Sequence, residues 1–180
     1  MAIASTDILY KLSTTSGSAG NTTAGTPAGS LGKYVSTTTV SSTAANNIFD
    51  DVTGAENAAS DVEYRCVFVL NNHASLTLTS AVVYMTSDIA GGTSVALGAD
   101  TTAASAKGSS SAQALQVADE NTAPSGVTFV TTPISDATGL SLGDIPAGSV
   151  KAFWIRRTAA NTTAVNSDGF TLNVAGDTTA

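Results

Sequence analysis

Asp61-Val62-Glu63-Tyr64-Arg65-Cys66-Val67-Phe68-Val69-Leu70-Asn71-Asn72 is the stretch that decides the fold, because β-branched and aromatic residues crowd together in it without a turn former. At the two-residue period of a strand, one face carries Tyr64, Cys66, Phe68 and Leu70. The other face carries Val67 and Val69, so both faces are largely apolar. A strand of this kind is covered on both sides, and we therefore predict that residues 61–72 form the central strand of a β fold.

Three further segments are predicted to be strands that pack around the central one. Residues 76–85 resume the strand pattern after a short polar connection and are expected to be its hairpin partner. Residues 150–157 contain the only tryptophan, Trp154, and are expected to lie beside the central strand. The last strand, 169–174, alternates cleanly, and its inward-facing residues are expected to be Phe170, Leu172 and Val174.

The whole chain follows the pattern of an all-β protein. Seven to ten short strands recur at intervals of roughly 8–12 residues with turn signals between them, and no window of eleven or more residues has helical spacing. This pattern predicts an antiparallel β-sandwich of immunoglobulin-like or jelly-roll kind, two architectures that the sequence does not distinguish. A chain of 180 residues fits one such domain, or one domain plus an arm.

The N-terminal region is predicted to be that arm. Residues 7–12 are typical of a short strand, whereas residues 13–32 have the Gly-, Ser- and Thr-rich composition of a flexible linker. Such a linker would span roughly 25 Å as a coil, so the strand could pair far from its own core. We therefore divide the chain into an arm, 1–32, and a sandwich domain, 33–180. The arm residues expected to clamp a neighbouring subunit are Ile8, Leu9, Tyr10 and Leu12.

Composition and charge exclude several classes of partner. Seven Lys and Arg stand against fourteen Asp and Glu, which disfavours a phosphate-binding surface, so nucleic acid is not expected as a partner. No apolar run approaches the ~20 residues that cross a bilayer, so no membrane is expected either. The N-terminus lacks the basic start and apolar run of a secretion signal, which favours assembly in the cytoplasm. The single cysteine, Cys66, is expected to be a small buried hydrophobe.

The candidate chemical groups point to structure rather than catalysis. His73, the only histidine, is predicted to be a turn residue, because the chain has no second histidine and no second cysteine to complete a transition-metal site. Asp50, Asp51 and Glu56, or the cluster 119–121, could offer oxygen ligands to calcium but lack the spacing of a dedicated loop. No pair of acids is marked out for glycoside hydrolysis. We therefore predict no enzyme, no cofactor and no metal site.

Arg156 and Arg157 form the only adjacent basic pair in the chain. One interpretation is a charged guard on an edge strand. The other is a contact with an acidic partner surface, which bidentate guanidinium groups suit. We favour the second, because in a chain with so few cations a pair is less often incidental.

Several segments resemble a family of small structural proteins from tailed bacteriophages. They are residues 7–15, beginning Asp7-Ile8-Leu9-Tyr10; Gly29-Ser30-Leu31-Gly32-Lys33-Tyr34; Asn47-Ile48-Phe49-Asp50-Asp51-Val52; Glu63-Tyr64-Arg65-Cys66 with the turn Asn71-Asn72-His73; residues 120–129; and Trp154-Ile155-Arg156-Arg157-Thr158. The resemblance covers most of the chain and carries no catalytic residue. It implies a virion component, most specifically a head decoration (cement) protein that binds and stabilises the major capsid protein shell.

The resemblance also implies a homo-oligomer, with a trimer as the first choice, on the exterior of a capsid assembled in the host cytoplasm. In this hypothesis Arg156 and Arg157 face an acidic capsid surface. Two alternatives remain open from the sequence: a tail or neck component of the virion, and a carbohydrate-binding β-sandwich. The second alternative would need two or three exposed aromatic residues, whereas Trp154, Phe153 and Tyr84 lie in strands expected to be buried.

Overall fold

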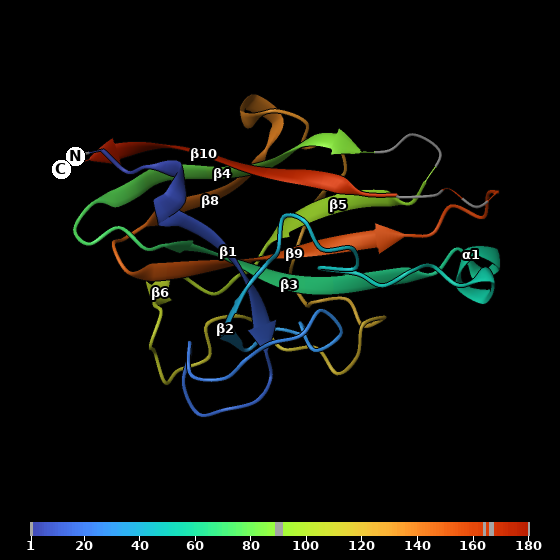
Figure 1. The fold of residues 1–180 in the computed structure, drawn as a ribbon, viewed down its shortest axis with the longest axis horizontal. Helices are drawn as coiled ribbons and strands as arrows, with labels where there is room; N and C mark the ends of the chain where they lie inside the picture. Colours follow the sequence, from blue (N-terminus) through green and yellow to red (C-terminus); the bar gives the residue numbers. More distant parts are fainter. Residues whose placement is uncertain (1, 89–91, 164, 166–167, 180) are drawn as a thin grey trace.

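A computed structural model describes residues 2–88, 92–163, 165 and 168–179. These residues form two antiparallel sheets that pack face to face, which confirms the predicted all-β sandwich (Figure 1). The helical segments are short: α1 (Gly54–Ala59) and two 3-10 helices, Ser5–Asp7 and Asp136–Thr138. The strands are β1 (Ile8–Thr14), β2 (Tyr34–Thr39), β3 (Val62–Asn71), β4 (Thr77–Asp88), β5 (Ser94–Ala99), β6 (Ser105–Ala106), β7 (Phe129–Val130), β8 (Leu140–Ile145), β9 (Ser149–Thr158) and β10 (Phe170–Thr179).

The larger sheet has the strand order β2-β1-β3-β9-β5-β7, with β6 also paired to β9. The strand predicted to be central, β3, lies between β1 and β9, and Cys66 is opposite Trp154 in the register of β3 with β9. The prediction that the tryptophan strand packs beside the central strand is therefore confirmed. The smaller sheet has the order β10-β4-β8.

The main core fills the space between the two sheets. Val67, Val69, Phe153 and Ile155 of the larger sheet face a row of residues from the smaller sheet. That row consists of Leu78, Ala81, Val83, Met85, Leu140, Leu142 and Ile145. Phe170, Leu172 and Val174 of β10 pack against the same core, as the alternation in the last strand predicts.

A second core lies on the outer face of the larger sheet. Cys66, Phe68 and Trp154 are fully buried there, although no strand of the smaller sheet covers them. Their cover consists of irregular chain from residues 15–33 and 107–128, which lies below the larger sheet in Figure 1. Ala114 and Val117 are the buried residues that this cover contributes. The apolar character of both faces of β3 is thus explained by a sheet at one face and loops at the other.

The structure corrects the expectation of an extended N-terminal arm. Residues 8–14 lie inside the larger sheet, where β1 pairs with β2 on one side and with β3 on the other. Beyond the end of β1, the backbone N–H of Cys66 donates to the carbonyl of Ser30 at 2.7 Å, so the supposed linker continues the pairing along β3. The described residues from 8 to 32 are therefore part of the same sandwich as the strands that follow them.

The glycines of residues 13–32 serve close packing rather than flexibility. Gly32 has a φ of +93°, and a Cβ at this position would lie 1.8 Å from the carbonyl oxygen of Leu115. A Cβ on Gly20 would lie 2.1 Å from Oε1 of Gln113. Small residues let this segment run directly over the outer face of the sheet, and linker composition alone does not separate that role from disorder.

The predicted hairpin between residues 61–72 and 76–85 is also wrong. β4 pairs with β8 and β10 in the smaller sheet, whereas both edges of β3 are occupied by β1 and β9. The connection 72–76 therefore carries the chain from one layer to the other. Asn71 fixes this crossing, because its side-chain amide donates to the carbonyls of Leu76 at 2.8 Å and Ile145 at 2.9 Å.

Candidate functional site

A groove of about 1060 Å³ lies between the start of β10 and the loop 40–54. Its walls include Tyr10 of β1, Phe170 and Leu172 of β10, and Asp168 and Gly169 just before β10. The loop 40–54 is long and polar, and its position over the end of the sandwich defines the groove. The forces that hold this loop therefore decide the shape of the site.

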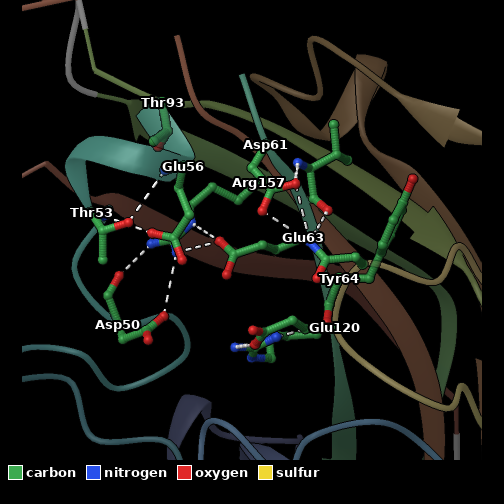
Figure 2. A network of polar contacts seen from close by, with 12 residues as sticks. Asp50, Thr53, Glu56, Asp61, Glu63, Tyr64, Thr93, Glu120 and Arg157 are labelled. Carbon is green, nitrogen blue, oxygen red and sulfur yellow. Dashed lines mark hydrogen bonds and ion pairs between the residues drawn. The ribbon is translucent and has the colours of Figure 1, made fainter. Parts of the chain in front are cut away.

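Arg157, at the end of β9, is the main clamp on this loop. Its Nε donates to the buried carboxylate of Glu63 at 2.7 Å, and its Nη2 forms an ion pair with the same carboxylate (Figure 2). Its Nη1 donates to the backbone carbonyl of Asp50, and Nη2 lies 3.4 Å from the Asp50 carboxylate. The guanidinium group thus joins β3, β9 and the loop 40–54.

Phe49 completes the clamp with an apolar surface. Its ring is buried, and the guanidinium groups of Arg157 and Arg65 lie over it, 4.6 Å and 5.3 Å from its centroid. Arg65 also forms an ion pair with Glu120, which brings the loop 119–122 to the same end of β3. Cation–π contacts of desolvated arginines stabilise such an arrangement more than exposed ones do.

A capping box shapes the segment that follows the loop. The Thr53 hydroxyl accepts a hydrogen bond from the backbone N–H of Glu56 at 3.3 Å. In return, the Glu56 carboxylate accepts from the backbone N–H of Thr53 at 2.6 Å. These reciprocal bonds start α1, and Ser60, in the left-handed conformation with φ 53°, ends it. The chain then enters β3 with Glu63 placed under Arg157.

Burial shifts the pKa of several groups near the groove. It raises the pKa of the Glu63 carboxyl above its usual value, although the hydrogen bond and the charge of Arg157 oppose this shift. Burial also raises the pKa of the Tyr10 hydroxyl, with a smaller contribution from Tyr84. The Tyr10 hydroxyl has no hydrogen-bond partner among the described residues.

We expect Arg157→Met to lower the free energy of unfolding by about 2–3 kcal/mol, because it leaves the buried Glu63 without its partner and frees the loop 40–54. The matched control is Arg156→Met, which should cost no more than about 1 kcal/mol, since Arg156 is half-buried and stacks on Phe129 instead of pairing with an acid. Urea unfolding followed by tryptophan fluorescence measures both changes. Equal losses for the two variants would contradict the clamp.

The same variant should have a distinct pH dependence. Without Arg157, the pKa of the buried Glu63 rises further, and a carboxyl with a raised pKa stabilises the fold only while it is protonated. Stability is therefore lost as the pH rises through that pKa and regained as the pH falls. The deficit of Arg157→Met relative to the unmodified chain should shrink between about pH 7 and pH 5.

The structure does not bring the predicted partner-binding residues together on one surface. Leu12 is buried, and Ile8, Leu9 and Tyr10 are half-buried against the cores on the two faces of the larger sheet. Arg156 and Arg157 point to opposite faces, because successive side chains of a strand alternate. Most of these side chains therefore make contacts within the chain, and the predicted contacts with other subunits remain predictions.

The other candidate groups lie in structural roles. The Nδ1 atom of His73 accepts hydrogen bonds from the backbone N–H groups of Ser75 at 3.1 Å and Leu76 at 3.0 Å, which shapes the connection to β4. Asp50 pairs with Arg157, Glu56 caps α1 and Glu120 pairs with Arg65. Within the described ranges, no three His, Cys, Asp or Glu side chains gather as a metal site would require.

Sequence reasoning missed a second buried polar centre, which is formed by Asp100. Its carboxylate accepts hydrogen bonds from Nε1 of Trp154 at 2.7 Å, from the N–H of Leu115 at 2.9 Å and from the N–H of Thr102 at 2.8 Å. Lys151 donates to the backbone carbonyl of Asp100 at 2.7 Å. These bonds tie the loop 100–118 to the outer face of the larger sheet. The tryptophan was visible in the sequence, but nothing linked it to an acid 54 positions away.

Comparisons of the chain with protein-family models, with curated proteins and with solved structures found no match. In the part of the chain that the structure describes, no helix has both the length and the apolar character needed to cross a membrane. Fold and site together define an all-β sandwich whose polar side chains clamp long loops onto two cores.

Proposed function

We propose that this protein is a non-enzymatic structural component of a tailed-phage virion, and most specifically a decoration protein that binds the major capsid protein on the exterior of the shell. The observation that carries the proposal is that buried polar side chains hold long loops against the sandwich. Arg157, Arg65 and Asp100 each fix a long loop to the sandwich. A protein whose work is adhesion needs such loops held in one shape, because ordering them on binding would cost affinity.

The character of the surface supports the same proposal. Ser and Thr make up more than a quarter of the chain, and only 12% of its residues are charged. The only exposed large hydrophobic residue in the described part is Ile134. A hydroxyl-rich exterior of this kind suits a protein that coats a particle and faces solvent. Oligomerisation, with a trimer as the first choice, belongs to the proposal.

Burial of the aromatic residues argues against the carbohydrate-binding alternative. Trp154 and Phe153 are completely buried, and Tyr84 is half-buried. These rings cannot form an exposed platform on which a sugar ring could stack. The tail or neck alternative is separated from the decoration role by location in the particle.

The proposal is tested by a cryo-EM reconstruction of the virus particle that contains this chain, together with re-addition of the purified protein to shells that lack it. We expect saturable binding at a fixed number of copies per capsomer and a higher melting temperature of the decorated shell. Density for the chain at the tail or neck would favour the alternative virion role. Absence of the chain from the particle would overturn both.

A further inference from the structure

The outer edge of β10 is an unpaired strand edge. In the smaller sheet, β10 pairs with β4 on one side, and no strand of the described residues pairs with it on the other. Its pairing with β4 shifts register between Thr171 and Leu172 and again between Ala175 and Asp177. Residues 172–175 therefore form a regular stretch whose outward-facing backbone groups have no hydrogen-bond partner among the described residues.

Apart from the register shifts at its two ends, residues 172–175 lack two common protections of an edge strand, a covering segment and a blocking lysine or proline. At the edge of the larger sheet, the chain covers β2 itself: Asn21 N–H donates to the Val35 carbonyl at 2.7 Å, and Thr37 N–H to the Thr23 carbonyl at 2.9 Å. β10 has no such cover among the described residues. Its sequence also contains neither lysine nor proline, the residues that commonly block edge strands.

The groove beside β10 favours a basic occupant. Its lining residues include Asp50, Asp51 and Asp168, and none of them is lysine, arginine or histidine. Arg157 pairs with Asp50, whereas Asp168 accepts hydrogen bonds from the neutral N–H and hydroxyl of Thr93 and has no cationic partner among the described residues. Asp51 is exposed. Cationic side chains of a ligand would be attracted to these carboxylates.

The apolar part of the groove favours an extended chain. Tyr10, Phe170 and Leu172 line it next to the open edge, so alternate side chains of an added strand would meet an apolar surface. A second copy of this chain is disfavoured as the occupant by its net charge of −7.

We propose that the edge of β10, together with the adjoining groove, binds an extended segment of a partner protein in which Lys or Arg alternates with apolar residues. The segment adds to the smaller sheet as a fourth strand beside β10. Main-chain hydrogen bonds to residues 172–175 provide affinity, and the carboxylates of Asp51 and Asp168 select for cationic side chains. The inference stands independently of a virion role, because it uses only the edge, the groove and their charges.

Binding of a labelled peptide, Lys-Val-Thr-Val-Lys-Val-Thr-Val-Lys, to the full chain tests the proposal by fluorescence anisotropy. A peptide with Glu in place of each Lys should bind at least roughly tenfold more weakly. Asp51→Asn should weaken binding of the basic peptide roughly threefold, as loss of one surface charge contact does. Asp119→Asn, outside the groove, makes the same change in net charge and should leave binding unaltered.

Backbone methylation of the peptide separates strand addition from nonspecific adhesion. Two versions carry N-methyl groups on alternate residues, in opposite phase, so only one loses the donors that face β10. We expect one version to lose at least roughly tenfold in affinity and the other to bind as before. Hydrogen–deuterium exchange should slow at residues 172–175 when the basic peptide is present.

Four results would overturn the proposal. The first is absence of saturable peptide binding up to about 1 mM, the weak end of specific recognition. The second is equal binding of the two methylated peptides, and the third is equal weakening by Asp51→Asn and Asp119→Asn. The fourth is protection of residues 172–175 that grows with protein concentration without peptide, which would assign the edge to a second copy of the chain.

Discussion

Deletion of residues 1–32 is expected to abolish cooperative folding of the remaining chain. β1 contributes one interface to β2 and another to β3, and residues 15–32 help to cover the core around Cys66 and Trp154. Their removal would expose the edge of β3 and apolar surface on its outer face. Burial of apolar area stabilises a fold by about 25 cal/mol per Å², and an ordinary domain is stable by only about 5–15 kcal/mol. We therefore expect the apolar area exposed by this deletion to cost more than the whole free energy of unfolding.

Near-ultraviolet circular dichroism and urea unfolding of residues 33–180 measure this effect. The expected result is a weak tertiary signal and no sigmoidal transition. Deletion of residues 1–6, which leaves β1 intact, is the control and should cost only about 1–2 kcal/mol, mainly through Ile3 at the edge of the main core. Addition of a peptide of residues 1–32 should restore the tertiary signal. A truncated chain that unfolds at the original urea concentration would restore the arm hypothesis.

Asp100→Ala is expected to lower the free energy of unfolding by about 4–5 kcal/mol. The substitution leaves the buried indole N–H of Trp154 and two backbone N–H groups without their acceptor. Each buried donor left unsatisfied costs about 1–3 kcal/mol, and the loop 100–118 would lose its attachment to the sheet. The indole is fully buried, so water cannot replace the carboxylate without opening the cover.

Asp51→Ala is the matched control for this prediction, because Asp51 is an exposed acid on a loop and its loss should change stability by less than about 0.5 kcal/mol. Urea unfolding gives both values. The red shift of tryptophan emission in the folded state gives an independent measure, since only loss of the Asp100 contact should let water reach Trp154. A cost for Asp100→Ala as small as that of the control would show that the loop is held by other contacts.

The sequence was sufficient to predict the position of a strand where its local pattern is compatible with only one arrangement. Apolar residues on both faces of residues 62–71 require cover on both sides, and the structure places β3 between a second sheet and a layer of loops. The pairing of β3 with the strand that contains Trp154 follows from the same reasoning, because both segments are too apolar to lie at an edge.

Prediction from the sequence failed where one composition is compatible with both a flexible linker and a closely packed segment. Glycine and small polar residues at 13–32 are typical of a flexible linker, but they also permit the close approach that Gly32 makes to Leu115. The separation of Arg156 from Arg157 could have been predicted, because adjacent residues of a strand point to opposite faces. The clamp formed by Arg157, Glu63 and Asp50 joins distant segments, and no local signal marks it.

The position of β3 between β1 and β9 has a consequence for synthesis of the chain. Val62 is opposite Thr158, so the larger sheet cannot be completed until residue 158 has left the ribosome. Strand pairings that close such long loops form slowly, typically in milliseconds to seconds. During translation, the edge of β3 that pairs with β9 therefore stays unpaired, which makes nascent chains that stall before residue 149 prone to aggregate.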